Sequence, residues 1–230
     1  MRIASLILGA VALLLSPGIP RATAQTPPFS GPQQSRGGGV QVDAIAVRIE
    51  DDVLTDSEIR ELAAFQQLVD GRAKDDAALL RELADQWIVR SEANTAKYPH
   101  PLPADVDRAY AQLVKQFASA EDFRARCAAV GLTEAAVRRM LEQQLYLSRF
   151  IDFRFRPAAQ VDDKQVEIYY HEEFAPQLKA RGQEAPPLDS VADTIREVLI
   201  QRGINDRATK WLDDTRGHLK IDVESPGAGR

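Results

Sequence analysis

The residue types that most often carry enzymatic chemistry are scattered along this 230-residue chain. Its histidines, His100, His171 and His218, are far apart and lack the spacing of a metal site. The acidic pairs mostly fall at expected turns or helix starts, where carboxylates interact with free N–H groups. These pairs are Asp51-Asp52, Asp75-Asp76, Asp162-Asp163, Glu172-Glu173 and Asp213-Asp214. We therefore predict a protein that is not an enzyme, with no catalytic residue, no metal site and no cofactor.

An aromatic and arginine-rich run, YLSRFIDFRFRP (residues 146–157), is the best candidate for a binding surface. It contains Tyr146, Phe150, Phe153 and Phe155, interleaved with Arg149, Arg154 and Arg156. One helix cannot hide all these rings in a single narrow stripe. Either several helices converge and cover them, or part of this surface lines an apolar groove for peptides, widened by arginine stems. The four aromatic residues are the predicted peptide-binding site.

The first 24 residues have the pattern of an export signal. Arg2 gives a positive start, the apolar run IASLILGAVALLL follows, and the small residues of 22–24 suit a signal peptidase. We predict a signal peptide over 1–24 with cleavage before Gln25; an uncleaved membrane anchor is the alternative. The mature protein is then exported, without stable insertion in a membrane.

Composition limits the partners of the chain. It has 29 Lys and Arg against 34 Asp and Glu, a net charge of −5. The predicted cleavage removes Arg2 and Arg21, which leaves 27 − 34 = −7. An acidic chain without a basic block argues against nucleic acid as a partner. Cys127 is the one cysteine, so no intrachain disulfide forms, and its apolar neighbours predict a small buried residue.

The chain divides into one domain with two tails. Residues 25–39 combine Pro, Gly, Ser and Gln with a single aromatic, which predicts a disordered leader. Residues 224–230 predict a second disordered tail. The 184 residues between them, 40–223, form a single helical domain of ordinary size.

The periodicity of that domain predicts a mainly α fold of about seven helices. A strand over 42–49, a turn at Asp51-Asp52 and a short return strand come first; Thr55 and Glu58 then form a capping box. Start and stop signals place the helices over about 56–70, 76–97, 106–117, 120–131, 134–156, 163–174 and, from Asp189 or Ser190, to about 212. The last helix has a predicted kink at Gly203, and 175–188 is a predicted loop.

Strand patterns occur only at the two ends of the domain. The segment LKIDV (219–223) alternates apolar and polar residues, as does the strand over 42–49. Because an isolated hairpin is marginally stable in water, we expect the final strand to pair with the first one. Removal of residues 217–230 should then lower stability sharply.

Several segments, taken in order, resemble the SurA-type periplasmic chaperones. They are VDAIAVRIEDDVLTDSEI, LLRELADQWIVRSEANTAK, DFRARCAAVGLTEAAVRRMLEQQL, VDDKQVEIYYHEEF and LDSVADTIREVLIQRGINDRATKWLDDTRGHLKIDV. The resemblance covers about 42–223. It implies a SurA N-terminal-like helical core closed by its terminal strands. It also implies binding of unfolded outer-membrane proteins in the periplasm without ATP.

One departure from that family concerns catalysis. Its members usually carry parvulin prolyl-isomerase domains before the closing helix, where this chain has only APQLKARGQEAPPL. We therefore expect an exported, ATP-independent holdase for unfolded polypeptides, without isomerase activity. The alternatives are an adaptor that binds one dedicated partner and, third, a degenerate prolyl isomerase.

Overall fold

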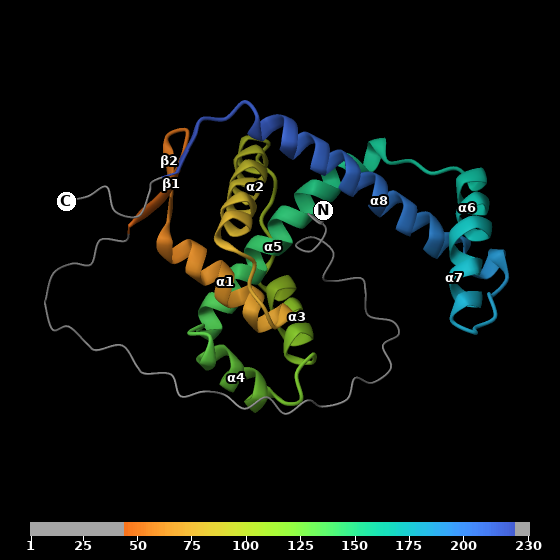
Figure 1. Ribbon diagram of the computed structural model, residues 1–230, viewed down its shortest axis with the longest axis horizontal. Coiled ribbons are helices and arrows are strands. Elements are labelled where there is room, and N and C mark those ends of the chain that lie inside the picture. Colours follow the sequence, from red (N-terminus) through yellow and green to blue (C-terminus); the bar gives the residue numbers. More distant parts are fainter. Residues whose placement is uncertain (1–43, 224–230) are drawn as a thin grey trace, which may run out of the picture.

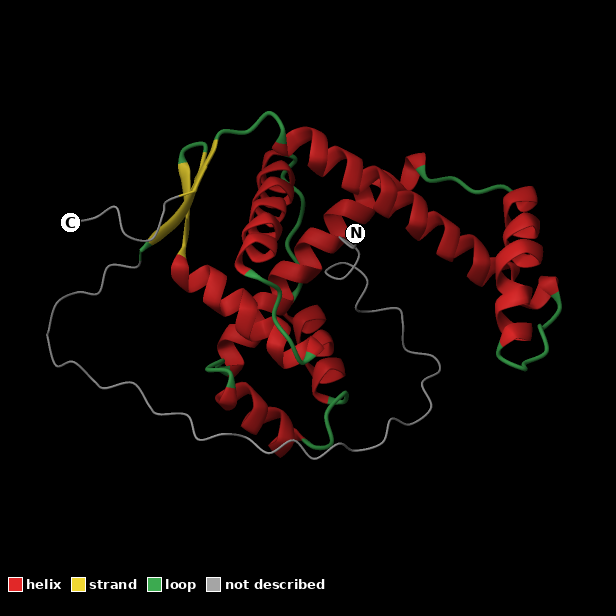
Figure 2. Ribbon diagram, in the orientation of Figure 1, coloured by secondary structure: helices red, strands yellow, loops and turns green. Residues whose placement is uncertain are grey.

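The two ends of the domain meet in one small sheet. The computed structural model describes residues 44–223, so the predicted signal peptide, leader and tail lie outside the described residues. Strands β1 (Ile45–Ile49), β2 (Asp52–Thr55) and β3 (Ile221–Val223) form an antiparallel sheet in the order β2-β1-β3 (Figures 1 and 2). The predicted pairing of the first and last strands is confirmed.

The hairpin turn differs by one residue from the prediction. Ile49 pairs with Asp52, so the turn consists of Glu50 and Asp51. Glu50 has a positive φ of 51°, and it also anchors the returning chain. Its N–H donates to the Lys220 carbonyl at 3.0 Å, and its carboxylate accepts from the Lys220 N–H at 2.8 Å. The turn therefore fixes β3 as well as β2.

Four of the five helices of the N-terminal half begin where local signals predict, α3 being the exception. Helix α1 (Asp56–Asp70) starts with the capping box of Thr55 and Glu58, and ends at Gly71, whose φ is 73°. Asp75 caps α2 (Asp76–Thr95), and Ser119 and Thr133 cap α4 (Ala120–Ala129) and α5 (Glu134–Phe155). Helix α3 (Pro103–Val114) begins and ends three residues earlier than the predicted 106–117, because Pro103 suits a first helical turn.

Helix α6 continues further than predicted. Asp162 and Gln165 form the expected capping box of α6 (Asp163–Tyr169). A π turn (Tyr170–Phe174) then leads directly into α7 (Ala175–Ala180), where a loop is predicted. In a regular helix the Pro176 ring would clash with a carbonyl of the preceding turn, and the wider π turn lies where that clash would occur. Only residues 181–187 form the loop.

Helix α8 (Leu188–Arg216) also differs from the prediction at two points. Pro187 is its N-cap, so the helix begins before Asp189 and Ser190. It runs unbroken through Gly203, where a kink is predicted. A Cβ at position 203 would lie 3.3 Å from the Ala159 Cβ, so this glycine allows close packing on the 3₁₀ turn (Arg156–Ala158) and its following residue.

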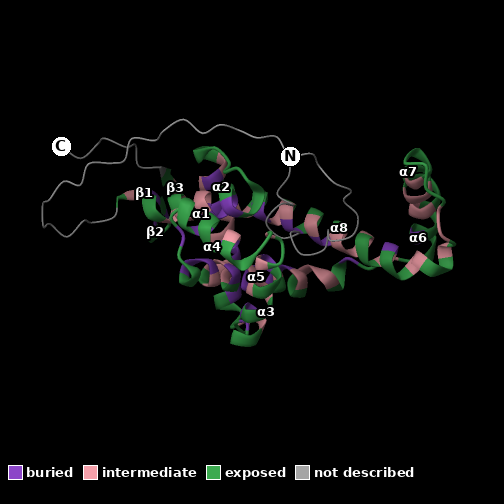
Figure 3. Cartoon of the chain, turned by 90° about the horizontal axis from the view of Figure 1, so that it is seen from below, coloured by how far each residue is buried: buried purple, intermediate pink, exposed green. Residues whose placement is uncertain are grey.

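These elements form two parts of unequal packing. We call the sheet, α1–α5 and the C-terminal half of α8 the body, and α6, the π turn, α7 and the N-terminal half of α8 the arm. The arm projects from the body along α8 (Figure 1). Buried positions concentrate on the body helices, whereas α6 and α7 are mostly intermediate or exposed (Figure 3). Counting the continuous α6–α7 rod once, the described chain has seven helical rods, in agreement with the prediction.

Helix α5 is central to the body because it contributes to two apolar clusters. Its N-terminal half packs with α1, α3 and α4, around Phe65, Phe123 and Val137. Its C-terminal half packs with α2 and α8, around Ile88, Phe150 and Ile204. The sheet covers a third cluster with α1 and α2, which contains Ile49, Leu54, Leu62, Leu79 and Leu83.

Candidate functional site

The predicted aromatic site is divided between the core and the surface. Tyr146 and Phe150 are only 4% and 1% exposed, whereas Phe153 is 61% exposed. All three contact Tyr98, with ring centroids 6.0, 5.6 and 5.3 Å from it, respectively. The Tyr146 hydroxyl donates to the Asn94 side chain at 3.0 Å. Tyr146 and Phe150 are therefore core residues, because α2 and α8 pack over them.

The fourth predicted residue lies away from this cluster. Phe155 is half-buried and packs against Trp211 of α8, with ring centroids 5.7 Å apart. The guanidinium of Arg154 lies 4.8 Å from the centre of the Trp211 ring. Sequence alone does not separate these rings; the helix that covers each face of α5 does. Peptide contact at Phe153 and Phe155 stays a prediction.

The neighbouring arginines are engaged in ion pairs. Arg149 contacts Asp105 at 2.7 Å, and its hydrogen bond lowers the pKa of that carboxyl. Arg156 contacts Asp152 at 2.8 Å and Glu197 at 2.7 Å, and it lowers the pKa of Glu197. A shallow hollow of about 700 Å³ lies beside Phe153 and Tyr98. Arg149 ties α5 to α3, and Arg156 ties the end of α5 to the N-terminal half of α8, so neither side chain is free to widen an apolar surface.

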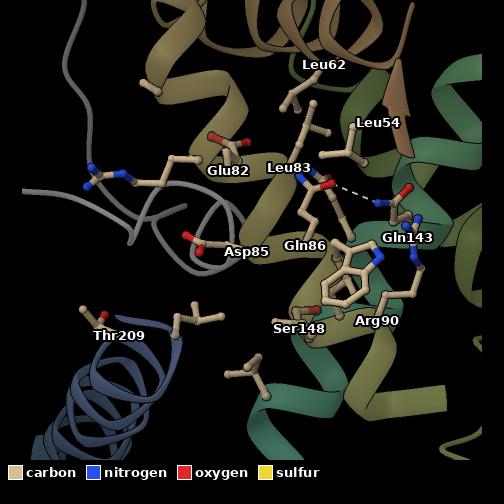
Figure 4. A pocket seen from close by; sticks show the side chains of 18 of the residues that line it. Leu54, Leu62, Glu82, Leu83, Asp85, Gln86, Arg90, Gln143, Ser148 and Thr209 are labelled. Atoms are coloured by element: carbon tan, nitrogen blue, oxygen red, sulfur yellow. Dashed lines mark hydrogen bonds between the residues drawn. The ribbon is translucent and has the colours of Figure 1, made fainter. Parts of the chain in front are cut away.

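A larger depression lies on the other side of α5. It is a groove of about 1230 Å³, bounded by α2 and the C-terminal half of α8, with α5 between them and β2 and α1 at one end (Figure 4). We call it the α2–α8 groove. Residues from these five elements line it, among them Leu54, Leu62, Arg81, Gln86, Gln143, Ser148 and Thr209. Ser148 also borders the hollow beside Phe153.

The floor of the groove is apolar and already well packed. Seven aliphatic residues in it are each under 10% exposed. They are Leu54, Leu62, Leu83, Val89, Leu147, Ile151 and Leu212. Trp87 and Met140 are half-buried and add larger apolar surfaces. The Trp87 indole N–H donates to Asp52 at 2.7 Å, which ties the sheet to α2.

Charges of both signs line the walls. The α8 wall has Asp206 and Asp214 together with Lys210, and the α2 wall has Arg81 and Arg90. An ion pair between Arg216 and Asp85 at 2.7 Å joins the two helices. The walls therefore offer no strong preference for a ligand of one charge.

Two acids, the buried Glu82 and the half-buried Asp85, fix the α2 side of the groove. Burial raises the pKa of Glu82, although Lys74 and Gln66 form hydrogen bonds with it. Burial also raises the pKa of Asp85, against the opposing effect of Arg216. Both carboxylates have cationic partners, so they stabilise local structure more than they offer free acid or base groups.

Uncharged polar groups complete the lining. Gln86 of α2 receives a hydrogen bond from the Gln143 side chain of α5 at 2.9 Å. Gln144 and Asn205 are further amides, and Ser148 and Thr209 contribute hydroxyls. Among the described residues that line the groove there is no histidine or cysteine. The lining offers apolar contact and hydrogen bonds rather than a nucleophile with an adjacent base.

The groove is absent from the sequence-based prediction because its residues are separated by up to 160 positions, from Leu54 to Asp214. The available signal was weak: glutamines at 86, 143 and 144 lie beside apolar residues such as Leu83, Met140 and Leu147. No helix of the described part is long and apolar enough to cross a membrane. No family model matches the chain, and no curated protein is significantly similar to it.

Proposed function

We propose that the protein is an exported, ATP-independent chaperone that holds unfolded polypeptides in the α2–α8 groove. The observation that supports this most strongly is the groove itself, an open depression of about 1230 Å³ with an apolar floor, amide side chains and charges of both signs. Such a lining makes many weak contacts with varied segments and does not require a particular sequence.

The energetics of the groove suit transient binding. A holdase must release its client without nucleotide, so each contact should be weak and exchangeable. The floor residues are already nearly buried, which limits the apolar area that a client can cover at about 25 cal/mol per Å². The net charge of −7 expected after cleavage, 27 − 34, favours solubility of the complex.

The resemblance to SurA-type chaperones supports a periplasmic location and outer-membrane proteins as clients. The expectation of a helical core closed by paired terminal strands agrees with the sheet of β1 and β3. We further propose that prolyl isomerisation is not part of the function. Between the π turn and α8 the chain forms only α7 and the loop of 181–187.

Light scattering tests this proposal. A chemically unfolded outer-membrane barrel is diluted into buffer with and without the protein of residues 25–230, in the absence of nucleotide. We expect suppressed aggregation at near-equimolar ratio. Gln144→Trp, which places an indole in the groove, should weaken suppression, whereas Gln112→Trp on the exposed face of α3 should not.

Two outcomes oppose the proposal. Undiminished aggregation with a protein that is folded by circular dichroism argues for an adaptor of one dedicated partner, which a pull-down would then identify. Equal suppression by both tryptophan variants and the wild type would mean that clients bind elsewhere. A proline-isomerisation assay checks the third alternative, and measurable catalysis would contradict the non-enzymatic proposal.

A further inference from the structure

We infer that the α2–α8 groove recognises the main chain of an extended polypeptide through a pair of amides, Gln86 and Gln143. This inference rests on the proposed function, and it specifies the chemistry of the ligand. The occupant is a segment without regular secondary structure, identified by its peptide groups rather than by its side chains.

The two glutamines form a bridge inside the groove. Gln86 comes from α2 and Gln143 from α5, and both are half-buried and line the groove. The Gln143 amide nitrogen donates to the Gln86 amide oxygen at 2.9 Å. Figure 4 shows the two side chains directed toward each other, with Leu54 and Leu83 of the floor nearby. The bridge is thus placed beside the apolar surface that a bound segment would cover.

The bond leaves a matched donor and acceptor. A primary amide has two N–H donors and an oxygen with two lone pairs. After the shared bond, the Gln86 nitrogen and the Gln143 oxygen have no partner among the described residues. In an extended chain the N–H and the C=O of the same residue point to the same side, so one residue of a bound segment can accept from Gln86 and donate to Gln143. This is the pattern that the edge of a strand offers to an added strand.

The packing of the floor makes such bonds necessary for affinity. Ile151, Leu212 and Leu62 are 0%, 2% and 3% exposed, so a ligand gains little by covering them. Main-chain hydrogen bonds are present in every polypeptide, and they therefore add affinity without selecting a sequence. Arg81, Lys210 and Asp206 at the walls tolerate ligand charges of either sign.

The same chemistry discriminates between unfolded and folded ligands. In an α-helix the main-chain N–H and C=O groups bond to each other, and in a sheet interior they bond to neighbouring strands. Only an extended, unpaired segment has both groups free. The amide pair would thus select unfolded chains, which is the discrimination that a holdase requires.

The test compares the binding of two peptides, one with free amides and one N-methylated, to the wild type and to two variants. A fluorescent ten-residue peptide with alternating apolar residues is titrated with the 25–230 protein, alongside a version N-methylated at alternate amides. We expect N-methylation to weaken binding to the wild type about fivefold, the usual effect of one or two lost hydrogen bonds. The Q86M/Q143M variant should bind both peptides equally, at about the affinity of the methylated one. Q112M on α3 should behave as the wild type.

The outcomes separate this inference from the proposed function. Equal affinity of the wild type for the two peptides overturns main-chain recognition and leaves the chaperone proposal intact. If N-methylation weakens binding to Q86M/Q143M as much as binding to the wild type, the inference is also overturned. The weaker binding would then come from a change in the peptide itself and not from lost hydrogen bonds to the two glutamines. Failure of the wild type to bind either peptide or to suppress aggregation refutes the proposed function itself. Unchanged thermal unfolding of the variants excludes misfolding as a cause.

Discussion

The body and the arm of this molecule are held together by different forces. In the body, α5 packs into two apolar clusters, and Val137, Phe150 and Ile151 are at most 1% exposed. In the arm, only Val166 and Ile195 are buried among the described residues of 160–200. Ion pairs of Arg196 with Asp163 and of Arg202 with Glu173 provide much of the remaining contact.

This difference predicts two levels of stability. Exposed ion pairs contribute about 0–1 kcal/mol each, whereas a buried aliphatic or aromatic side chain contributes about 1.5–3 kcal/mol. The arm should therefore open without unfolding the body. The α2–α8 groove lies entirely on body elements and the part of α8 that packs with them. The proposed binding site is accordingly on the more rigid part of the protein.

The largest loss in the free energy of unfolding should come from a substitution in the core of the body. Phe150→Ala removes a ring that is 1% exposed and should lower the free energy of unfolding by about 3–5 kcal/mol, as measured by urea denaturation. Phe153→Ala, on the same helix but 61% exposed, is the matched control and should change it by less than about 1 kcal/mol. Similar losses in the two variants would contradict the burial that separates them.

The closure of the sheet should have the next largest effect. Deletion of 217–230 removes β3 together with Leu219 and Ile221, which pack against the sheet cluster, and should cost about 2–4 kcal/mol. Deletion of 224–230 keeps β3 and serves as the control. If thermal unfolding is the same for both deletions and the full chain, the paired ends do not stabilise the fold.

A smaller and local effect is expected in the arm. Val166→Ala removes two methyl groups from a side chain that is 2% exposed, which should cost about 1–2 kcal/mol within the arm. Hydrogen exchange should then accelerate in residues 163–180 while protection in α5 stays unchanged. Equal loss of protection in both regions would show that body and arm unfold as one unit.

The smallest expected effect is the pH dependence of stability that Glu82 contributes. Because burial raises the pKa of Glu82, the folded protein binds protons more readily there than the unfolded chain does. Glu82 therefore contributes stability at low pH that is lost as pH rises through its folded pKa. Glu82→Gln should remove this contribution, so that wild type loses stability relative to the variant between pH 4 and pH 7. Chemical denaturation across that range measures it; the opposite trend would mean that Lys74 dominates.

Local signals in the sequence predict much of the fold. Thr55, Ser119, Thr133 and Asp162 start helices where expected because a cap depends on residues three positions away. The pairing of β3 with β1 also follows, since strands need partners. The predicted start of α8 and the predicted loop over 175–180 were wrong because proline occurs both in loops and at helix starts, so Pro176 and Pro187 do not decide between the two.

The candidate site was less predictable than the fold. Phe150 and Phe153 are three positions apart in one helix and both contact Tyr98, so their different burial depends on the helices that cover α5. The groove depends on residues of five elements that only the tertiary structure brings together. Gln86 and Gln143 are 57 positions apart, and nothing in their local sequence indicates that they bond.

Site-specific photocrosslinking tests the central claim, that clients bind in the α2–α8 groove, most directly. A photoreactive phenylalanine replaces Arg81 or Thr209 on the two walls, or exposed Arg124 on α4 as the control, and each protein is irradiated with an unfolded outer-membrane barrel. We predict strong crosslinks from positions 81 and 209 and little from 124. Crosslinks from 124 that equal or exceed those from the groove would contradict the claim.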